Sequence, residues 1–222
     1  MPDSVNRILH VDVVSDVVCP WCFIGKRRLA AALATIAAER PDLDVRVNWH
    51  PFQLNPELPP EGADRRSYLE RKFGGPERAA QIYDRVRAAG ATVGIAFAFD
   101  RIERQPNTLD AHRLISWAQA RGAGDAVVDA LFHAYFLDGR HVGDRDVLAD
   151  IAGEAGLDRE AARAMLGTDE GEDTVRALDA RVRELGVDGV PFFIFGDQVA
   201  VSGAQEAKVL EDAMAQALAG AG

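Results

Sequence analysis

The two cysteines of this 222-residue chain are separated by two residues, in the sequence Cys19-Pro20-Trp21-Cys22. A strand-like run of apolar residues at 8–15 precedes them, and a helical run at 26–40 follows. A cysteine at the start of a helix lies among unpaired backbone N–H groups and at the positive end of the helix dipole, which stabilise a thiolate. The second cysteine, three positions further on, can close a disulfide on the first. The spacing therefore predicts a redox-active dithiol.

A purely structural disulfide is the less favoured interpretation of this pair. A disulfide that closes so short a loop removes little entropy from the unfolded chain. Residues 1–7 lack the apolar core of a signal peptide, and no apolar run approaches the roughly 20 residues of a membrane span. We therefore expect a cytoplasmic protein with no membrane association, and structural disulfides are rare in that compartment.

The net charge of −10 argues against nucleic acid as a partner, because its phosphates require a positive protein surface. The chain has five histidines, which could suggest a metal site together with the two cysteines. Structural zinc requires four ligands at clustered spacings, and only one short cysteine pair is present. We expect no metal and no organic cofactor.

Strands and helices alternate at both ends of the chain. The pattern predicts a strand at 8–15, a helix at 20–39 and a second strand at 45–49, parallel to the first through a right-handed crossover. Near the other end, a strand at 190–195, a two-residue turn at Gly196-Asp197 and an antiparallel strand at 198–201 lead into a closing helix at 204–219. The first of these late strands, rich in phenylalanine, is expected to be buried on both faces.

The middle of the chain has a different composition. A proline-rich linker at 54–62 comes first, and Asp144 and Asp158 have the residue type and position of helix N-caps. The predicted helices of this block are 65–73, 76–90, 108–121, 124–137, 144–155, 158–166 and 171–185. The simplest organisation is an α/β domain formed by residues 1–60 and 187–222, split by an all-helical insertion at 61–186.

A strand–CxxC–helix unit followed much later by a proline-led strand, a hairpin and a helix resembles the thioredoxin fold. The helical block between the two halves is similar to that of the DsbA family of thiol–disulfide oxidoreductases. Five strings resemble the FrnE-like branch in particular: Ser15–Cys22, Pro51–Pro56, Pro106-Asn107-Thr108 with Ala111-His112, Gly189–Phe192 and Val201–Gln205. The resemblance implies an α/β thioredoxin-like fold with an inserted all-helical domain.

The same resemblance assigns roles around the dithiol. It implies that Cys19 is the nucleophile and that Cys22 is the resolving cysteine, the more buried of the two. Trp21 stands where the strongest oxidants of the family have histidine, so we expect a weaker oxidant, with Pro20 and Trp21 tuning the couple and Trp21 partly exposed to apolar substrate. Val190-Pro191 corresponds to the cis-proline loop, whose backbone N–H and C=O could pair with a substrate strand.

Other residues are weaker candidates for the site. His112, on a predicted helix just after Asn107-Thr108, is the best candidate for the site among the histidines, because this stretch could cover the dithiol. For His112, as for the other histidines, we favour the alternative of a packed or surface residue. A carboxylate beneath the dithiol, Asp12 or Asp16, could carry the proton of the resolving cysteine. We favour the alternative that Asp16 caps or solvates its loop and that Asp12 lies at a sheet edge.

The sequence thus predicts a thiol–disulfide oxidoreductase that acts on protein or peptide thiols, with glutathione as a potential co-substrate. A reducing cytosol would favour reduction or isomerisation. One alternative is a glutathione-dependent enzyme similar to kappa-class transferases or 2-hydroxychromene-2-carboxylate isomerases, which usually carry serine where this chain has Cys19. Another is a non-catalytic chaperone or binding module. Monomer and homodimer are both compatible with the sequence.

Overall fold

The computed structural model of the protein describes residues 7–220. Its strands are β1 (Arg7–Ser15), β2 (Leu43–Pro51), β3 (Ala63–Asp64), β4 (Arg104–Gln105), β5 (Phe192–Phe195) and β6 (Val199–Ser202). Its helices are α1 (Pro20–Glu39), α2 (Arg65–Phe73), α3 (Pro76–Ala91), the 3-10 turn η1 (Phe99–Arg101), α4 (Leu109–Gln119), α5 (Gly124–Phe136), α6 (Arg145–Glu154), α7 (Arg159–Leu166), α8 (Glu172–Glu184) and α9 (Ala207–Gly220).

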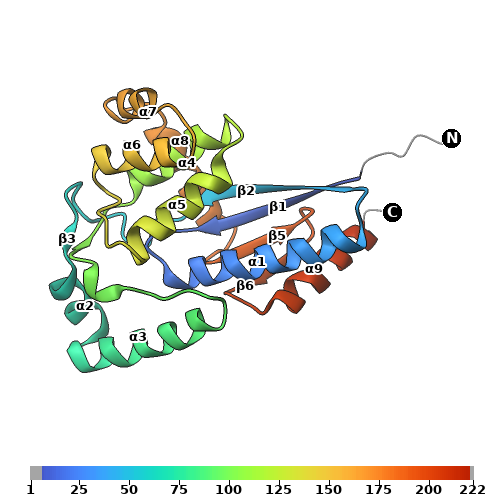
Figure 1. Cartoon of the computed structure of the whole chain (residues 1–222), viewed down its shortest axis with the longest axis horizontal. Helices are drawn as coiled ribbons and strands as arrows, with labels where there is room; N and C mark the ends of the chain where they lie inside the picture. The colour runs from blue at the N-terminus through green and yellow to red at the C-terminus, as the bar shows by residue number, and fades with distance from the viewer. Residues whose placement is uncertain (1–6, 221–222) are drawn as a thin grey trace.

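A four-stranded sheet of order β2-β1-β5-β6 joins the two ends of the chain (Figure 1). Strand β1 pairs in parallel with β2, which confirms the predicted pairing, and it also pairs antiparallel with β5. Helices α1 and α9 run side by side along this sheet (Figure 1). Leu9, Val11 and Val13 of β1 and Leu29 of α1 belong to one hydrophobic core. The α/β thioredoxin-like arrangement with a helical insertion is therefore present.

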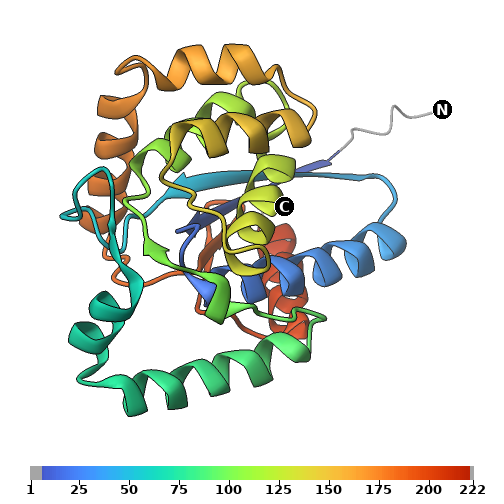
Figure 2. The same ribbon diagram turned by 60° about the vertical axis from the view of Figure 1, so that its left-hand side comes forward.

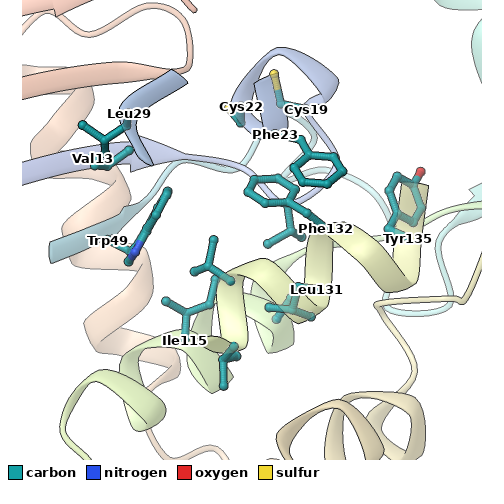
Figure 3. Close-up of a cluster of buried hydrophobic side chains, with 14 of the residues drawn as sticks. Val13, Cys19, Cys22, Phe23, Leu29, Trp49, Ile115, Leu131, Phe132 and Tyr135 are labelled. Carbon is teal, nitrogen blue, oxygen red and sulfur yellow. The ribbon is translucent and has the colours of Figure 1, made fainter. Parts of the chain in front are cut away.

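The helices of the insertion lie on two sides of the beginning of α1, with α2 and α3 on one side and α4–α8 on the other (Figure 2). The ring of Phe23 in α1 stacks on that of Phe132 in α5 with centroids 5.2 Å apart, and Figure 3 shows the two rings next to each other. Among other aromatic residues, Trp49, Phe52, Phe132, Tyr135 and Phe136 are buried and Trp117 is partly buried. Aromatic packing thus fixes the first turns of α1 against the insertion.

The helix boundaries agree closely with the sequence pattern. Helices α1 and α2 span the predicted residues, and the carboxylates of Asp144 and Asp158 accept hydrogen bonds from first-turn N–H groups of α6 and α7. None of the helices within residues 7–220 combines the length and apolarity needed to cross a bilayer.

The second half of the sheet differs from prediction in two respects. Strand β5 is not buried on both faces: Phe193 and Phe195 are buried, whereas Phe192 and Ile194 are half-buried, because the second face is only partly covered. The turn has three residues and not two, since Phe195 pairs with Val199. The closing helix also starts later, at Ala207, and the short ribbon β3–β4 has no counterpart among the predicted strands.

Candidate active site

Cys19 is the N-cap of α1, with an extended backbone (φ −93°, ψ 111°). Its carbonyl accepts the backbone N–H groups of Cys22 and Phe23, at 3.0 and 3.4 Å. Pro20 is the first helical residue, where the N–H that proline lacks would have no intrahelical partner. The local sequence therefore begins the helix directly after the first cysteine, whose side chain lies at the N-terminal end of the helix and makes no hydrogen bond to the N–H groups of the first turn.

The two thiols are free, and they differ in access to solvent. Cys22 is 2% exposed and Cys19 is 6% exposed, while Trp21 between them is 39% exposed. These exposures confirm the predicted order of burial and the partial exposure of Trp21. Burial raises the pKa of the Cys22 thiol well above its ordinary value, and the adjacent Cys19 raises it further, against a lowering by the Ser15 hydroxyl and the Asp16 backbone. Cys22 is therefore held as a thiol.

The Val190–Pro191 loop lies against the dithiol, as the resemblance implies. The peptide bond between these residues is cis, and the Cys19 Sγ lies 3.6 Å from the Val190 carbonyl oxygen. The Pro191 carbonyl accepts the Gly203 N–H at 2.8 Å, which ties the loop to the end of β6. Gly25 of α1 allows this approach, because a Cβ there would lie 2.9 Å from Pro191 Cγ. The fold thus brings together residues about 170 positions apart in the sequence.

A groove of about 220 Å³ borders Cys19. Cys19, Pro20 and Trp21 form one wall, and α2 and α3 form the other. The α2–α3 wall contributes apolar and aromatic side chains together with two cations, Arg65 and Lys72. The groove gives a substrate a path to the sulfur of Cys19.

Arg65 is the unusual member of this groove, because its guanidinium is buried (4% exposed). Its Nη1 donates to Gln105 Oε1 at 2.6 Å and to the Tyr135 hydroxyl at 2.7 Å, and its Nη2 donates to the Tyr83 hydroxyl at 2.8 Å. All three partners are neutral, and no carboxylate within residues 7–220 pairs with it. A buried charge of this kind attracts an anion. Sequence reasoning missed Arg65, since nothing local distinguishes it from Arg66.

The remaining candidates lie away from this groove. Asn107 donates to the Leu58 carbonyl at 2.6 Å and accepts from Gln53, so it anchors the proline-rich linker and does not cover the dithiol. His112 is buried in α4 on the insertion side, next to Asp16.

Both aspartates also differ from the favoured interpretation. Asp16 is fully buried and does not solvate its loop; its Oδ2 accepts the Leu54 N–H at 2.8 Å. Asp12 lies on the inner strand β1 and not at an edge of the sheet. Its Oδ1 lies 2.7 Å from the Nε2 of His50. Contacts with segments that are distant in the sequence decide where both aspartates lie. No three His, Cys, Asp or Glu side chains of the described residues converge as a metal site would require.

Three features together define a thioredoxin-like protein. They are the sheet with its helical insertion, the CxxC pair at the start of a helix, and the adjoining cis-proline loop. Comparison with known families agrees: the model of the DSBA-like thioredoxin domain family matches residues 10–215. The chain belongs to this family.

Two relatives and one solved structure that shares the fold illustrate the similarity. A probable DsbA oxidoreductase from Streptomyces coelicolor is 35% identical, with a TM-score of 0.85 over 95% of this chain and 90% of the other. The uncharacterized protein YwbO of Bacillus subtilis is 30% identical over 93% of this chain and 96% of its own length. A 2-hydroxychromene-2-carboxylate isomerase has a TM-score of 0.68 at 17% identity, over 93% and 95% of the two chains, and shares the fold alone. The FrnE-like branch stays a prediction.

Proposed function

We propose that the protein is a thiol–disulfide oxidoreductase in which Cys19 attacks and Cys22 resolves. The observation that carries the proposal is the position of Cys19, which starts α1, lies 3.6 Å from the Val190 carbonyl and lines an open groove. A substrate strand that pairs with the backbone of the Val190–Pro191 loop would bring its disulfide to this sulfur.

The reaction proceeds in two exchanges. The Cys19 thiolate attacks one sulfur of the substrate disulfide, forms a mixed disulfide and releases the other substrate sulfur as a thiolate. Cys22 then loses its proton and attacks Cys19, which closes the protein disulfide and releases the second substrate thiolate. Two electrons pass from the dithiol to the substrate, and an external thiol such as glutathione restores the dithiol. In a reducing cytosol this direction is favoured over net oxidation.

Insulin reduction with glutathione or dithiothreitol as the electron donor tests the assignment. We expect activity for the wild type, none for Cys19→Ser, and accumulation of a mixed disulfide for Cys22→Ser. A Cys22→Ser variant that turns over at the wild-type rate, or a wild type without activity, would refute the proposal. Retained protection of an unfolding client by the double cysteine variant, without any exchange activity, would favour a chaperone instead.

The groove suggests the kind of substrate. Its apolar wall with Trp21 suits an aliphatic or aromatic side chain, and the buried Arg65 suits a carboxylate a few ångströms from the disulfide. Glutathione disulfide and acidic peptides carry such a group, whereas hydroxyethyl disulfide does not. We therefore assign disulfides with a nearby carboxylate as preferred substrates.

Arg65→Met compared with Arg66→Met tests this preference. Arg66 is the next residue, with a side chain 86% exposed, and pairs only with Glu70. Loss of a charge-assisted hydrogen bond costs about 1.5–3 kcal/mol, so Arg65→Met should lower kcat/KM for glutathione disulfide by about 10- to 100-fold. Hydroxyethyl disulfide should be reduced equally by both variants. A parallel loss on the two substrates would mean that Arg65 only supports the fold.

A further inference from the structure

The outer edge of β2 has no neighbouring strand within residues 7–220, and Figure 1 shows β2 along the upper rim of the sheet. At one position this edge is already occupied by a side chain. The Trp49 N–H donates to the Gln119 Oε1 at 2.6 Å, and the Gln119 Nε2 donates to the Trp49 carbonyl at 3.0 Å. The amide group of Gln119 thus takes the place of one residue of a neighbouring strand.

The contact with Gln119 identifies the backbone groups of β2 that point outward. In a strand, the N–H and C=O of one residue point to the same side, and successive residues alternate between the two sides. Because Trp49 points outward, Val45 and Val47 do so as well. No side chain or loop of the described residues forms a hydrogen bond with these two residues on that side. An edge with unpaired groups of this kind is a template for a further strand.

The surface beside this edge is hollowed and largely apolar. A groove of about 360 Å³ lies between β2 and α1, and it is lined by Leu33 of α1 together with Val45 and Val47. All three side chains are only partly buried. The charged residues of the groove satisfy each other, since the Lys26 Nζ lies 3.0 Å from the Asp125 Oδ2. The groove therefore offers apolar surface to whatever pairs with the edge.

The charges on the other face of β2 indicate which strand fits. Asp44 and Arg46 lie two positions apart, so they share one face, and their charged atoms are 3.1 Å apart. Their side chains are 39% and 58% exposed. In an antiparallel pairing of two copies with Val45 opposite Val45, Asp44 of each copy lies opposite Arg46 of the other. Opposite charges at such positions stabilise a pair of strands.

Neighbouring registers of the same pairing are disfavoured. The outward residues must face one another for the backbone groups to bond, so the centre of the pairing moves in steps of one residue along β2. A centre at Asp44 places Asp44 opposite Asp44, and a centre at Arg46 places Arg46 opposite Arg46. Like charges directly opposite each other are destabilising. The charge pattern of β2 is thus complementary to itself in one register.

We propose that two copies of this chain associate through residues 43–47 of β2, antiparallel and with Val45 on a two-fold axis, to form one continuous sheet. Val45 pairs with Val45 of the second copy, and Val47 pairs with its Leu43. The Leu43 N–H already donates to the Arg40 carbonyl at 3.1 Å, so Leu43 contributes only its carbonyl. Gln119 ends the free edge at Trp49 and so keeps the pairing short. An interface of this size forms a weak dimer that depends on concentration.

The proposed dimer leaves the dithiol accessible. Residues 43–47 pair with residues 7–11 at the start of β1, whereas the cysteines follow the end of that strand. The groove beside Cys19 is lined by no residue of β2. Each copy therefore keeps its own active groove, and the association is independent of the proposed redox activity.

Sedimentation equilibrium from micromolar to millimolar concentration tests the pairing. We expect the wild type to pass from monomer to dimer. Arg46→Asp places like charges opposite each other and should weaken the dimer by about 10- to 100-fold. Asp44→Arg combined with Arg46→Asp exchanges the two charges and should restore it. Arg78→Asp, the same change of charge at an exposed position of α3, is the matched control and should associate like the wild type.

The backbone provides a second test. The Val45 N–H points away from β1, so Val45→Pro removes no hydrogen bond within the sheet, and proline is tolerated at such an edge. This variant should fold and stay monomeric. In the wild type, hydrogen exchange at the amides of Val45 and Val47 should slow as the concentration rises, while exchange at the buried amides of β1 should not change.

Three results would overturn the proposal. A wild type that is monomeric at millimolar concentration would show that Asp44 and Arg46 protect the edge from pairing. A dimer that persists in both Arg46→Asp and Val45→Pro would show that the copies meet through another face. A dimer that Arg46→Asp abolishes and the double charge exchange does not restore would refute the register.

Discussion

Replacement of Gly25 by alanine tests how closely the Val190–Pro191 loop must approach the dithiol. Gly25 lies in the second turn of α1, and a Cβ there would lie 2.9 Å from Pro191 Cγ and 3.1 Å from the ring of Phe193. Both distances are shorter than ordinary contacts, and both partners are buried. The added methyl group must therefore displace the loop, the ring or the start of the helix.

The expected cost combines two opposite effects. Alanine stabilises a helix interior by about 1 kcal/mol relative to glycine. Overpacking of a well-filled core costs about 1–3 kcal/mol. Gly25→Ala should therefore be destabilised by up to about 2 kcal/mol. Gly153→Ala in α6 is the matched control, because its Cβ would lie no closer than 3.4 Å to Arg159 Cβ and the helix gain remains.

Urea unfolding and insulin reduction, measured on the same two variants, check this reasoning. We expect Gly153→Ala to be as active as the wild type and more stable. Gly25→Ala should be about 1–3 kcal/mol less stable than Gly153→Ala, which isolates the steric clash from helix propensity. The activity of Gly25→Ala should fall by more than its loss of folded protein accounts for, because the Val190–Pro191 loop moves relative to Cys19. Equal stability and equal activity of the two variants would refute the claim that Gly25 sets this distance.

Three further predictions follow from the site and its supporting helices. Trp21→His should make the reduction potential more oxidising by about 20 mV, because a cation near the thiolate contributes about 1 kcal/mol; an unchanged or more reducing potential would contradict this. In Cys19→Ser, the remaining Cys22 should react with iodoacetamide more slowly than a model thiol at neutral pH. Its rate should rise only above the ordinary thiol range, since burial raises its pKa; ordinary reactivity at neutral pH would show that Cys22 is accessible. Asp144→Ala should cost about 1 kcal/mol in urea unfolding, because two N–H groups of α6 lose their cap; an unchanged midpoint would show that water replaces the cap fully.

Local sequence signals predicted the elements that carry the dithiol. Helix α1 begins at Pro20 because proline is favoured in a first turn, and it places Cys19 at the N-cap without help from distant residues. The aspartate caps and the helices of the insertion were likewise predicted from short-range patterns. The family resemblance, and not a local pattern, supplied the cis bond before Pro191.

The sequence by itself thus determined the CxxC pair, the order of the main strands and helices, and the helix that positions Cys19, because each depends on residues within a few positions of one another. Only the tertiary structure decided the surroundings of that pair. Asp16 becomes buried because the linker closes over it at Leu54, and His112 reaches it from a helix almost 100 residues away. Arg65 becomes a buried cation because three neutral side chains from distant segments enclose it. Long-range packing sets such environments, and no spacing along the chain encodes them.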